Sequence, residues 1–400
     1  MSTDIASPQD GTGAAQRRRP WGMLKGFGRT EGALLSGATT TALFYGVSDV
    51  LVGEPAVDAR TIALFLWLFA VMLWCAFGVV RHADSLAEML GEPYGTLILT
   101  LAVIVIEVSV ISAVMLHGEN QPALARDTMF AVLMIILNAM VGLALLLGGL
   151  RHGEQHYNLQ GAKAFLAVLV PLAVLTLVLP SYTSSTVHPM FTPPQALFFA
   201  AMTVVLYGVF LLIQTVRHKN QFVEPGVWVE AAPSPLVPDD TAHEHGHHAV
   251  VSVPYHAVLL LLTILPVVLL SKKLAVFVDY GIETMRAPDA LGGLIVATLV
   301  LAPEGLGALR AARADRLQRS VNILLGSALA TISLTVPAIL MIGLVTGRNV
   351  ALGLDQVEMI LLLLTLAVSS LTFTGGRTNI LQGAIHLALF FAFIALIFSP

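Results

Sequence analysis

Hydrophobic residues along this chain fall into long runs that are separated by shorter polar segments. A helix needs about 20 apolar residues to cross the hydrocarbon core of a bilayer, and roughly eleven runs approach that length. They cover residues 32–52, 59–80, 95–117, 128–150, 161–180, 194–216, 255–276, 291–312, 320–345, 356–374 and 379–398. Asp49 and many small residues dilute the first run. The pattern predicts an all-α, polytopic transmembrane protein with about eleven spans.

Composition supports the same class. Hydrophobic residues make up 56% of the chain and charged residues 12%, with a mean hydropathy of +0.82, whereas soluble domains carry roughly a quarter charged residues. A net charge of −4 gives no reason to expect nucleic-acid binding. The single cysteine, Cys75, lies inside an apolar run, so an intramolecular disulfide is excluded.

Basic residues are divided unequally between the two sides of the predicted spans. If the amino terminus is cytoplasmic, fifteen Lys and Arg residues fall on that side and six on the other. This bias satisfies the positive-inside rule. We therefore expect residues 1–30 to form a cytoplasmic tail, the carboxyl terminus to lie outside, and the protein to be a multi-pass component of the cell's inner membrane.

One long polar segment, 217–254, interrupts the apolar runs and is expected to be a cytoplasmic linker. Besides several prolines and acidic residues, it contains four clustered histidines, which are His243, His245, His247 and His248. No fixed geometry is implied, so a solvated linker is one interpretation. The other is a regulatory loop that responds to pH or to transition metals.

Two glutamates occupy corresponding positions in the two halves of the chain. Glu107 lies twelve residues after Gly95, and Glu304 lies twelve residues after Gly292, with matching apolar residues between. Five spans separate the two glutamate helices, and a repeat with an odd number of spans in one chain must be inverted. The sequence thus predicts two inverted repeats of five helices.

These repeats set the expected domain boundaries. The first repeat covers 59–216 and the second 255–400, and one extra transmembrane helix lies within 31–58. Four arginines stand where the eighth span ends and the ninth begins; they are Arg310, Arg313, Arg316 and Arg319. Anchoring of the topology and contact with lipid head groups is the expected role, and gating is the alternative.

Both glutamates are expected near the middle of the membrane. At 1.5 Å per residue, twelve residues carry each one about 18 Å into a core roughly 30 Å thick. A charged group there costs about 2.5–3.5 kcal/mol on insertion scales, so an intramembrane acid suggests a functional site. A protonated glutamate that merely bonds a neighbouring helix is the alternative. The matched pair favours cation and proton binding by Glu107 and Glu304.

Residues around Glu304 suggest how an ion is bound. Pro303 removes one backbone donor and frees the carbonyl of Leu299, so we expect a break in the helix beside the carboxylate. Gly305 lets another backbone come close. A free carbonyl beside a carboxylate suits Na⁺, K⁺ or Ca²⁺. A simple packing kink is the other interpretation.

The helix after each glutamate helix also carries small and polar residues. Pairs spaced four apart form one helical stripe, and such stripes either bind the cation or join helices. The pairs are Asn138 with Gly142 and Ser327 with Thr331, with Ser333 and Thr335 as secondary candidates. Asp49, Asp84 and Glu92 are the next acids to consider if the two glutamates do not carry the proton.

Several motifs resemble one known family. They lie at 79–84, 91–95, 107–112, 207–215, 302–309, 326–337 and 376–379. Together they resemble the ChaA-type calcium and sodium-potassium/proton antiporters of the cation/calcium exchanger superfamily. The resemblance implies that Glu107 and Glu304 are the ion-binding acids and that Gly326 belongs to the close-packed Gly-Ser pair of the second repeat. Many relatives have Gly-Asn shortly before each glutamate, where this chain has apolar residues and Pro303.

The expected function is therefore exchange of an inorganic cation, Ca²⁺ and/or Na⁺ or K⁺, for protons at one midplane site. A passive cation channel is the main alternative. A membrane-embedded hydrolase fits less well, because no hydrolase motif lies on a span and His386, the deeply placed histidine, is expected to be packed. The protein is thus expected to be a transporter and no enzyme. Its expected partners are lipid, cations and protons, without a cofactor, and a homo-oligomer is possible.

Overall fold

A computed structural model describes most of the chain. The described residues are 31–46, 58–91, 94–116, 122–224, 252–288 and 290–399. Asp49, Glu92 and the histidine-rich part of the linker lie outside them, as does the amino-terminal tail. In the described part, the helices join into eleven rods, as predicted. Nine of these described rods are long and apolar enough to cross a membrane, which agrees with a polytopic membrane protein.

The first half of the chain contains one additional helix and five rods. The additional helix is α2 (Gly32–Gly46). The five rods are α4 (Ala59–Leu90), α5 (Tyr94–Met115), α6–η1–α7 (Leu124–Met134, Ile135–Met140 and Val141–His152), α8–η2–η3 (Leu159–Ala173, Val174–Val178 and Leu179–Tyr182) and α9–η4 (Pro193–Leu212 and Ile213–Arg217). The turn η5 (Lys219–Phe222) follows the last rod.

The second half contains five more rods. They are α10 (Val253–Met285), α11 (Ala290–Arg313), α12–η7–α13 (Leu317–Ala330, Thr331–Thr335 and Val336–Thr346), α14 (Gln356–Thr372) and α15 (Ile380–Phe398). Two short strands, β1 (Gln155–His156) and β2 (Arg377–Thr378), pair antiparallel and tie the halves together. Both η1 and η7 are π-helical turns inside a continuous rod.

Polar side chains define where several rods begin. Asp58 caps α4 by accepting a hydrogen bond from the Thr61 N–H at 2.7 Å, and this bond lowers the pKa of its exposed carboxyl group. Asn379 with Gln382 forms a reciprocal capping box at the start of α15. Such caps satisfy backbone donors that have no partner inside the helix. These short polar motifs therefore separate consecutive apolar runs.

Two rods extend beyond the apolar runs that predicted them. Helix α4 continues ten residues past the expected end at residue 80 and carries Arg81, Asp84 and Glu88 on its last turns. Helix α10 likewise continues to Met285. Charged residues end a hydropathy signal without ending a helix, because Arg, Glu and Leu all favour helical conformation.

Hydrogen bonds between connecting segments define two ends of the molecule. At one, here called the basic end, Gln155 donates to the carbonyl of Ala312 at 2.9 Å, and Tyr255 donates to Glu31 at 3.0 Å. At the opposite end, the Ala351 N–H donates to the Pro122 carbonyl at 2.9 Å. Helix α10 starts at the basic end and α4 at the opposite end. The halves thus run in opposite directions; their superposition by a two-fold axis stays a prediction.

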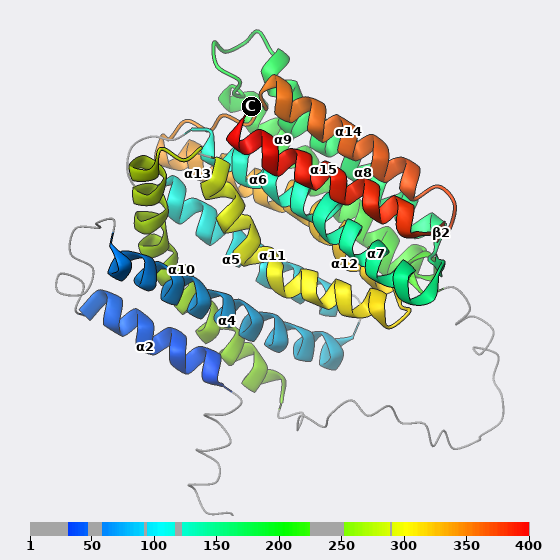
Figure 1. Cartoon of the computed structure of the whole chain (residues 1–400), viewed down its shortest axis with the longest axis horizontal. Helices are drawn as coiled ribbons and strands as arrows, with labels where there is room; N and C mark the ends of the chain where they lie inside the picture. The colour runs from blue at the N-terminus through cyan, green and yellow to red at the C-terminus, as the bar shows by residue number, and fades with distance from the viewer. Residues whose placement is uncertain are drawn as a thin grey trace, which may run out of the picture.

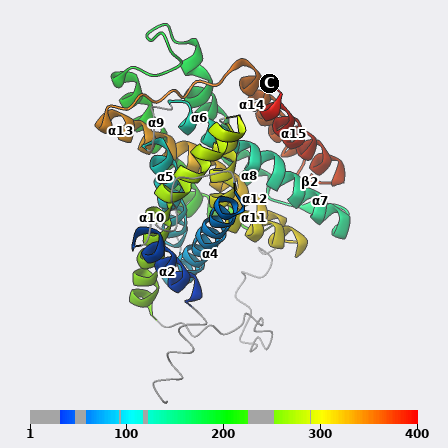
Figure 2. The same ribbon diagram turned by 60° about the vertical axis from the view of Figure 1, so that its left-hand side comes forward.

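The rods form three groups (Figure 1). Helices α2, α4 and α10 lie side by side along one edge, and α8, α9, α14 and α15 lie on the other side of the molecule. Helices α5, α6, α11 and α12 lie between them. The turned view in Figure 2 shows α9 beside α13 on one side of these helices and α14 with α15 on the other. Every residue of α6 is buried. The glutamate helices α5 and α11 therefore belong to the centre of the fold.

Candidate cation-binding site

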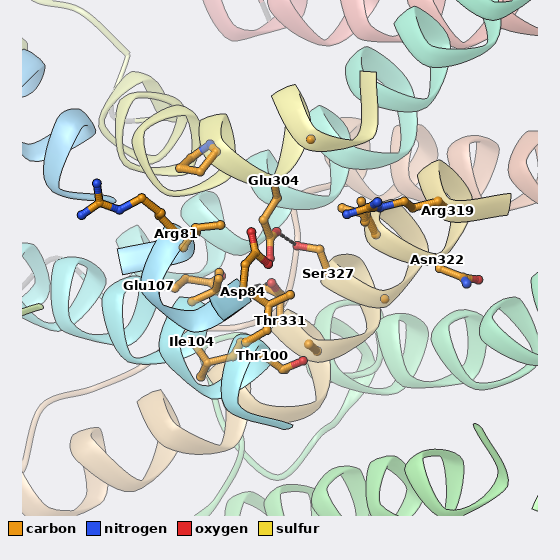
Figure 3. Close-up of a pocket in the computed structure, with 18 of the residues that line it drawn as sticks. Arg81, Asp84, Thr100, Ile104, Glu107, Glu304, Arg319, Asn322, Ser327 and Thr331 are labelled. Atoms are coloured by element: carbon orange, nitrogen blue, oxygen red, sulfur yellow. Dashed lines mark hydrogen bonds between the residues drawn. The ribbon is translucent and has the colours of Figure 1, made fainter. Parts of the chain in front are cut away.

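Both glutamates line one cavity of about 950 Å³ in the centre of the molecule. The cavity walls come from α4, α5, α8, α9–η4, α10, α11 and α12–η7. Figure 3 shows Glu107 projecting from α5 and Glu304 from α11 toward this space. The structure thus brings together two acids that lie almost 200 residues apart in the chain.

Glu107 is fully buried, with 1% of its surface exposed. Its Oε2 atom accepts hydrogen bonds from Thr331 Oγ1 at 3.1 Å and from Thr335 Oγ1 at 3.0 Å. Its Oε1 atom is buried and has no hydrogen-bond partner among the described residues. An unsatisfied buried acceptor costs about 1–3 kcal/mol, more when charged. A proton or a cation at Oε1 removes that cost, so this carboxyl group fits a transported cation.

Glu304 is only half-buried, and its carboxylate accepts a short hydrogen bond from Ser327 Oγ. Pro303 also lines the cavity. The predicted helix break is absent, because α11 is continuous from Ala290 to Arg313. A single proline removes one hydrogen bond, and the bonds of the flanking turns keep the helix intact. Leu299 is fully buried and lies outside the cavity lining, so its predicted role as a carbonyl ligand finds no support.

All three hydroxyl groups that bond the glutamates come from one rod. Ser327 lies on α12, and Thr331 and Thr335 lie on the π-helical turn η7. These residues are spaced four apart, so they follow one face of the rod. Thr335, only a secondary candidate in the sequence, is as close to Glu107 as Thr331 is. The π-helical turn fits this role, since such turns are frequent at functional sites.

Asn138 and Gly142 do not reach this cavity. Asn138 donates to Thr365 Oγ1 at 2.8 Å, and its Oδ1 lies 3.3 Å from His386 Nδ1. A Cβ atom on Gly142 would lie 3.0 Å from the carbonyl oxygen of Gly383. The stripe predicted from these residues therefore joins α6–α7 to α14 and α15. The carboxamide finds buried partners there, which explains why it turns away from the glutamates.

His386 completes this second polar cluster. It is fully buried, and its Nε2 lies 2.9 Å from Thr372 Oγ1. Its role as a packed helix residue agrees with the prediction.

The predicted close-packing glycines make different contacts. A Cβ on Gly305 would lie 2.5 Å from Met140 Cε, so this glycine receives a side chain of the first half and no backbone. Gly326 lines the cavity and has only ordinary contact with the Phe165 ring. Gly142 does meet a backbone, that of Gly383, and on α11 the close backbone approach occurs at Gly293, where a Cβ would lie 2.8 Å from the Thr128 nitrogen.

The cavity opens toward the basic end. Its lining includes the exposed residues Arg81, Glu88, Arg310 and Arg319, which lie on the parts of α4, α11 and α12 nearest that end. On α5 the lining runs from Leu99 to Glu107 and goes no further toward the opposite end. The glutamates therefore lie at the floor of an aqueous vestibule that is accessible from one side.

The opposite end is closed by packed and ion-paired residues. Arg126 is 9% exposed; its Nε lies 2.7 Å from Asp127 Oδ1 and its Nη1 donates to the Gly353 carbonyl at 3.2 Å. Asp355 lies 3.5 Å and Glu358 3.8 Å from the same guanidinium. This cluster ties α6 to α14 and the segment before it, at the end toward which the cavity does not extend.

Further polar residues of the cavity wall had no part in the predicted site. They are Asp84, Ser85, Thr100, Tyr207, Gln214 and Asn322. Asp84 and Tyr207 belong to the motifs at 79–84 and 207–215, which is the signal that marks them in the sequence.

A sequence model of one protein family covers both halves around this cavity. The family is described as "Sodium/calcium exchanger protein", and its model matches residues 60–216 and 255–399. The chain belongs to this family. The match leaves out the tail, α2 and the linker, so the family core is the ten rods that surround and support the two glutamates.

The chain is also similar to individual relatives. It is 42% identical over 363 residues to the sodium-potassium/proton antiporter ChaA of Escherichia coli (strain K12), covering 90% of this chain and 96% of that protein. Among solved structures, native YfkE matches with a TM-score of 0.69 at 17% identity, over 92% of this chain and 100% of YfkE. The H⁺/Ca²⁺ exchanger CAX matches with a TM-score of 0.63 at 15% identity, over 92% and 89%. The two structures support the fold.

Proposed function

We propose that this protein is a secondary active transporter that exchanges an inorganic cation for protons at a site formed by Glu107 and Glu304. One observation carries the proposal. Two carboxyl groups from halves that run in opposite directions line the floor of one cavity, and the cavity opens at one end only. Alternating exposure of a midplane site between inverted halves is the general mechanism of many such transporters.

The chemistry of the site couples cation and proton. A carboxylate that is removed from water is destabilised as an anion, so an unloaded site favours bound protons. A cation that arrives at Glu107 and Glu304 stabilises the anionic form and expels those protons. Carboxylate and hydroxyl oxygens are hard ligands suited to Na⁺, K⁺ or Ca²⁺. Binding and proton release at one place give antiport without a separate proton channel.

The identity of the cation rests on charge balance. Two carboxylates neutralise one divalent ion, whereas a monovalent ion leaves one negative charge or requires one acid to stay protonated. The ChaA relative is named for sodium and potassium, and CAX for calcium. We therefore propose Ca²⁺ and/or Na⁺ or K⁺ as the cation class.

The basic end is proposed to face the cytoplasm. The positive-inside rule assigns the arginine-rich loops to that side, and Arg81, Arg310 and Arg319 surround the cavity mouth. On this assignment the structure represents a conformation open to the cytoplasm, and the carboxyl terminus lies outside.

Purified protein in vesicles tests the function directly. A pH dye inside the vesicles reports proton movement while Na⁺, K⁺, Ca²⁺ or Mg²⁺ is added separately. We expect the wild type to move protons against at least one cation, and Glu107→Gln and Glu304→Gln each to reduce exchange to background. Glutamine keeps the size of the side chain and removes the titratable proton. Glu154→Gln is the control, because Glu154 is an exposed acid that pairs with Arg377 at 3.4 Å, away from the cavity.

Two outcomes would contradict the proposal. Near-wild-type exchange in both glutamine variants would show that another acid carries the proton. Cation flux that dissipates its gradient without moving protons would identify a passive channel.

A further inference from the structure

Four carboxyl groups line the cavity; Glu88 lies at its mouth, and the other three lie at graded depths. Glu107 is fully buried, Glu304 is half-buried, and Asp84 is exposed to the cavity. Asp84 lies on α4, outside the rods that carry the two glutamates and their hydroxyl partners. Figure 3 shows Asp84 and Glu304 projecting into the same space, and the two are near enough to interact electrostatically. The three acids thus form a path from the floor of the cavity toward its mouth.

Asp84 is not held by a structural partner. Among the described residues, no hydrogen bond and no ion pair within 4.0 Å is formed by its carboxylate. Glu31, on the same side of the molecule, contrasts with it, because its two oxygens bond Arg81, His82 and Tyr255. An acid that is neither paired nor capped is free to gain and lose a proton without breaking a structural contact.

Other charged and titratable groups surround Asp84 on every side of the cavity. They are Arg81 and Glu88 on α4, Glu107 on α5, Tyr207 on α9, His256 on α10, Glu304 and Arg310 on α11, and Arg319 on α12. Arg319 attracts the Asp84 carboxylate while Glu88 repels it. The guanidinium groups at the mouth disfavour a free hydronium ion there. A carboxylate between these guanidinium groups and Glu304 can take up the proton and become a neutral carboxyl group. The proton can then cross the positively charged region without being a free cation.

We propose that Asp84 relays protons between Glu304 and the water at the basic end, an inference that rests on the proposed antiport function. When a cation enters, the Glu304 carboxyl group gives its proton to the Asp84 carboxylate and becomes the anionic ligand. The Asp84 carboxyl group then gives that proton to water, which forms hydronium and restores the Asp84 anion. The same steps in reverse load the site with protons when the cation leaves.

The relay solves a problem of access. Cation and proton use the same opening, so an incoming cation stands between Glu304 and bulk water. Transfer between two groups of the same chemical type needs little driving force, which is the condition for efficient proton transfer. Asp84 therefore lets the proton depart sideways along the α4 wall as the cation arrives.

Two transport assays with one variant separate a relay from a structural role. Cation/proton exchange needs proton release in each cycle, whereas exchange of labelled cation for unlabelled cation across the same vesicles needs none. We expect Asp84→Asn to slow cation/proton exchange roughly tenfold or more, as for loss of a positioned acid–base group. Cation/cation exchange should stay within about twofold of the wild type, and Asp84→Glu should restore proton coupling.

The controls keep the outcomes distinct. Glu154→Gln should leave both assays unchanged, and Glu304→Gln should abolish both, because it removes the site itself. Equal losses of both activities in Asp84→Asn, or an unchanged rate of cation/proton exchange, would overturn the relay and leave the two-glutamate site standing. If Asp84→Asn does not reach the vesicles, Asp84→Ser is measured with the same expectation. Activity in Glu304→Gln would instead refute the proposed function.

Discussion

The two halves of the molecule hold their glutamates in unequal surroundings. Glu107 of the first half is fully buried and accepts hydrogen bonds from two threonine hydroxyl groups of the second half. Glu304 of the second half is half-buried and accepts a hydrogen bond from one serine hydroxyl group on the next rod of its own half. The sequence repeat therefore places two equivalent acids, while the structure gives them different partners and different access to water.

The difference originates in the rods that follow the glutamate helices. Among the described residues, rod α12–η7–α13 supplies every hydroxyl group that donates a hydrogen bond to Glu107 or Glu304. Its counterpart α6–η1–α7 directs Asn138 toward His386 and Thr365 instead. If the two halves contributed equally to the site, the cavity would open equally toward both ends. Unequal engagement is what allows a cavity to be open at one end and closed at the other.

The largest expected effect comes from breaking the bonds that distinguish Glu107. The double variant Thr331→Val, Thr335→Val keeps the side-chain shape and removes both donors. Hydrogen bonds to charged groups contribute about 1.5–3 kcal/mol each, so cation affinity should fall by roughly a hundredfold or more. Ser327→Ala should cost roughly tenfold or less, because water reaches the half-buried Glu304. Cation dependence of exchange in vesicles measures both, and equal losses would remove the distinction between the two acids.

An intermediate effect is expected from the rod that turns away from the site. Asn138→Leu removes one hydrogen-bond partner from His386 and one from Thr365, and should lower the free energy of unfolding by about 1–3 kcal/mol. Cation affinity should not change. Thermal unfolding in detergent measures the change in stability, and vesicle transport measures the cation affinity. Ser369→Ala is the control, since its buried hydroxyl group has no partner to lose among the described residues. Weaker cation binding at unchanged stability would instead show that Asn138 belongs to the cation-binding site.

The smallest effects are expected at the cavity mouth. Arg310 and Arg319 line the cavity, whereas Arg313 and Arg316 do not. Arg310→Gln and Arg319→Gln remove positive charge near an anionic site, so the cation concentration for half-maximal exchange should fall about twofold to threefold at low salt. The Gln variants of Arg313 and Arg316 should match the wild type in this respect. A salt-independent shift, or equal shifts at all four positions, would show that these arginines do not act through the field of the cavity.

Most of the fold follows from the hydropathy pattern, because a bilayer forces long apolar runs into helices. All eleven runs correspond to described rods. The ends of α4 and α10 were misjudged, since charged residues that continue a helix beside an aqueous cavity look like a loop to a hydropathy scan. The paired glutamates, Ser327 and Thr331 could also be predicted from the sequence, because equivalent positions in the two halves and four-residue spacing can be recognised there.

The partners of each residue were harder to predict. Asn138 has the spacing of a ligand, but its orientation is decided by His386, which lies about 250 residues away in the chain. The expected break at Pro303 does not occur, because the hydrogen bonds of the flanking turns keep α11 continuous. Asp84 was predicted only as one of three reserve acids for the proton, because no spacing rule relates α4 to the glutamate rods. Local patterns identify candidate groups, and tertiary packing decides which of them meet.

The one-sided cavity also determines where a membrane potential acts on this protein. A vestibule that carries electrolyte to the glutamates extends the potential of the adjoining solution to that depth, so most of the voltage drop falls across the sealed half between the glutamates and the Arg126 cluster. An elementary charge that crosses the full potential gains or loses about 2.3 kcal/mol per 100 mV. An ion that enters through the vestibule crosses little of it. Binding from the open side is then nearly insensitive to voltage, and any electrical work is confined to the step that re-exposes the loaded or protonated site at the opposite end.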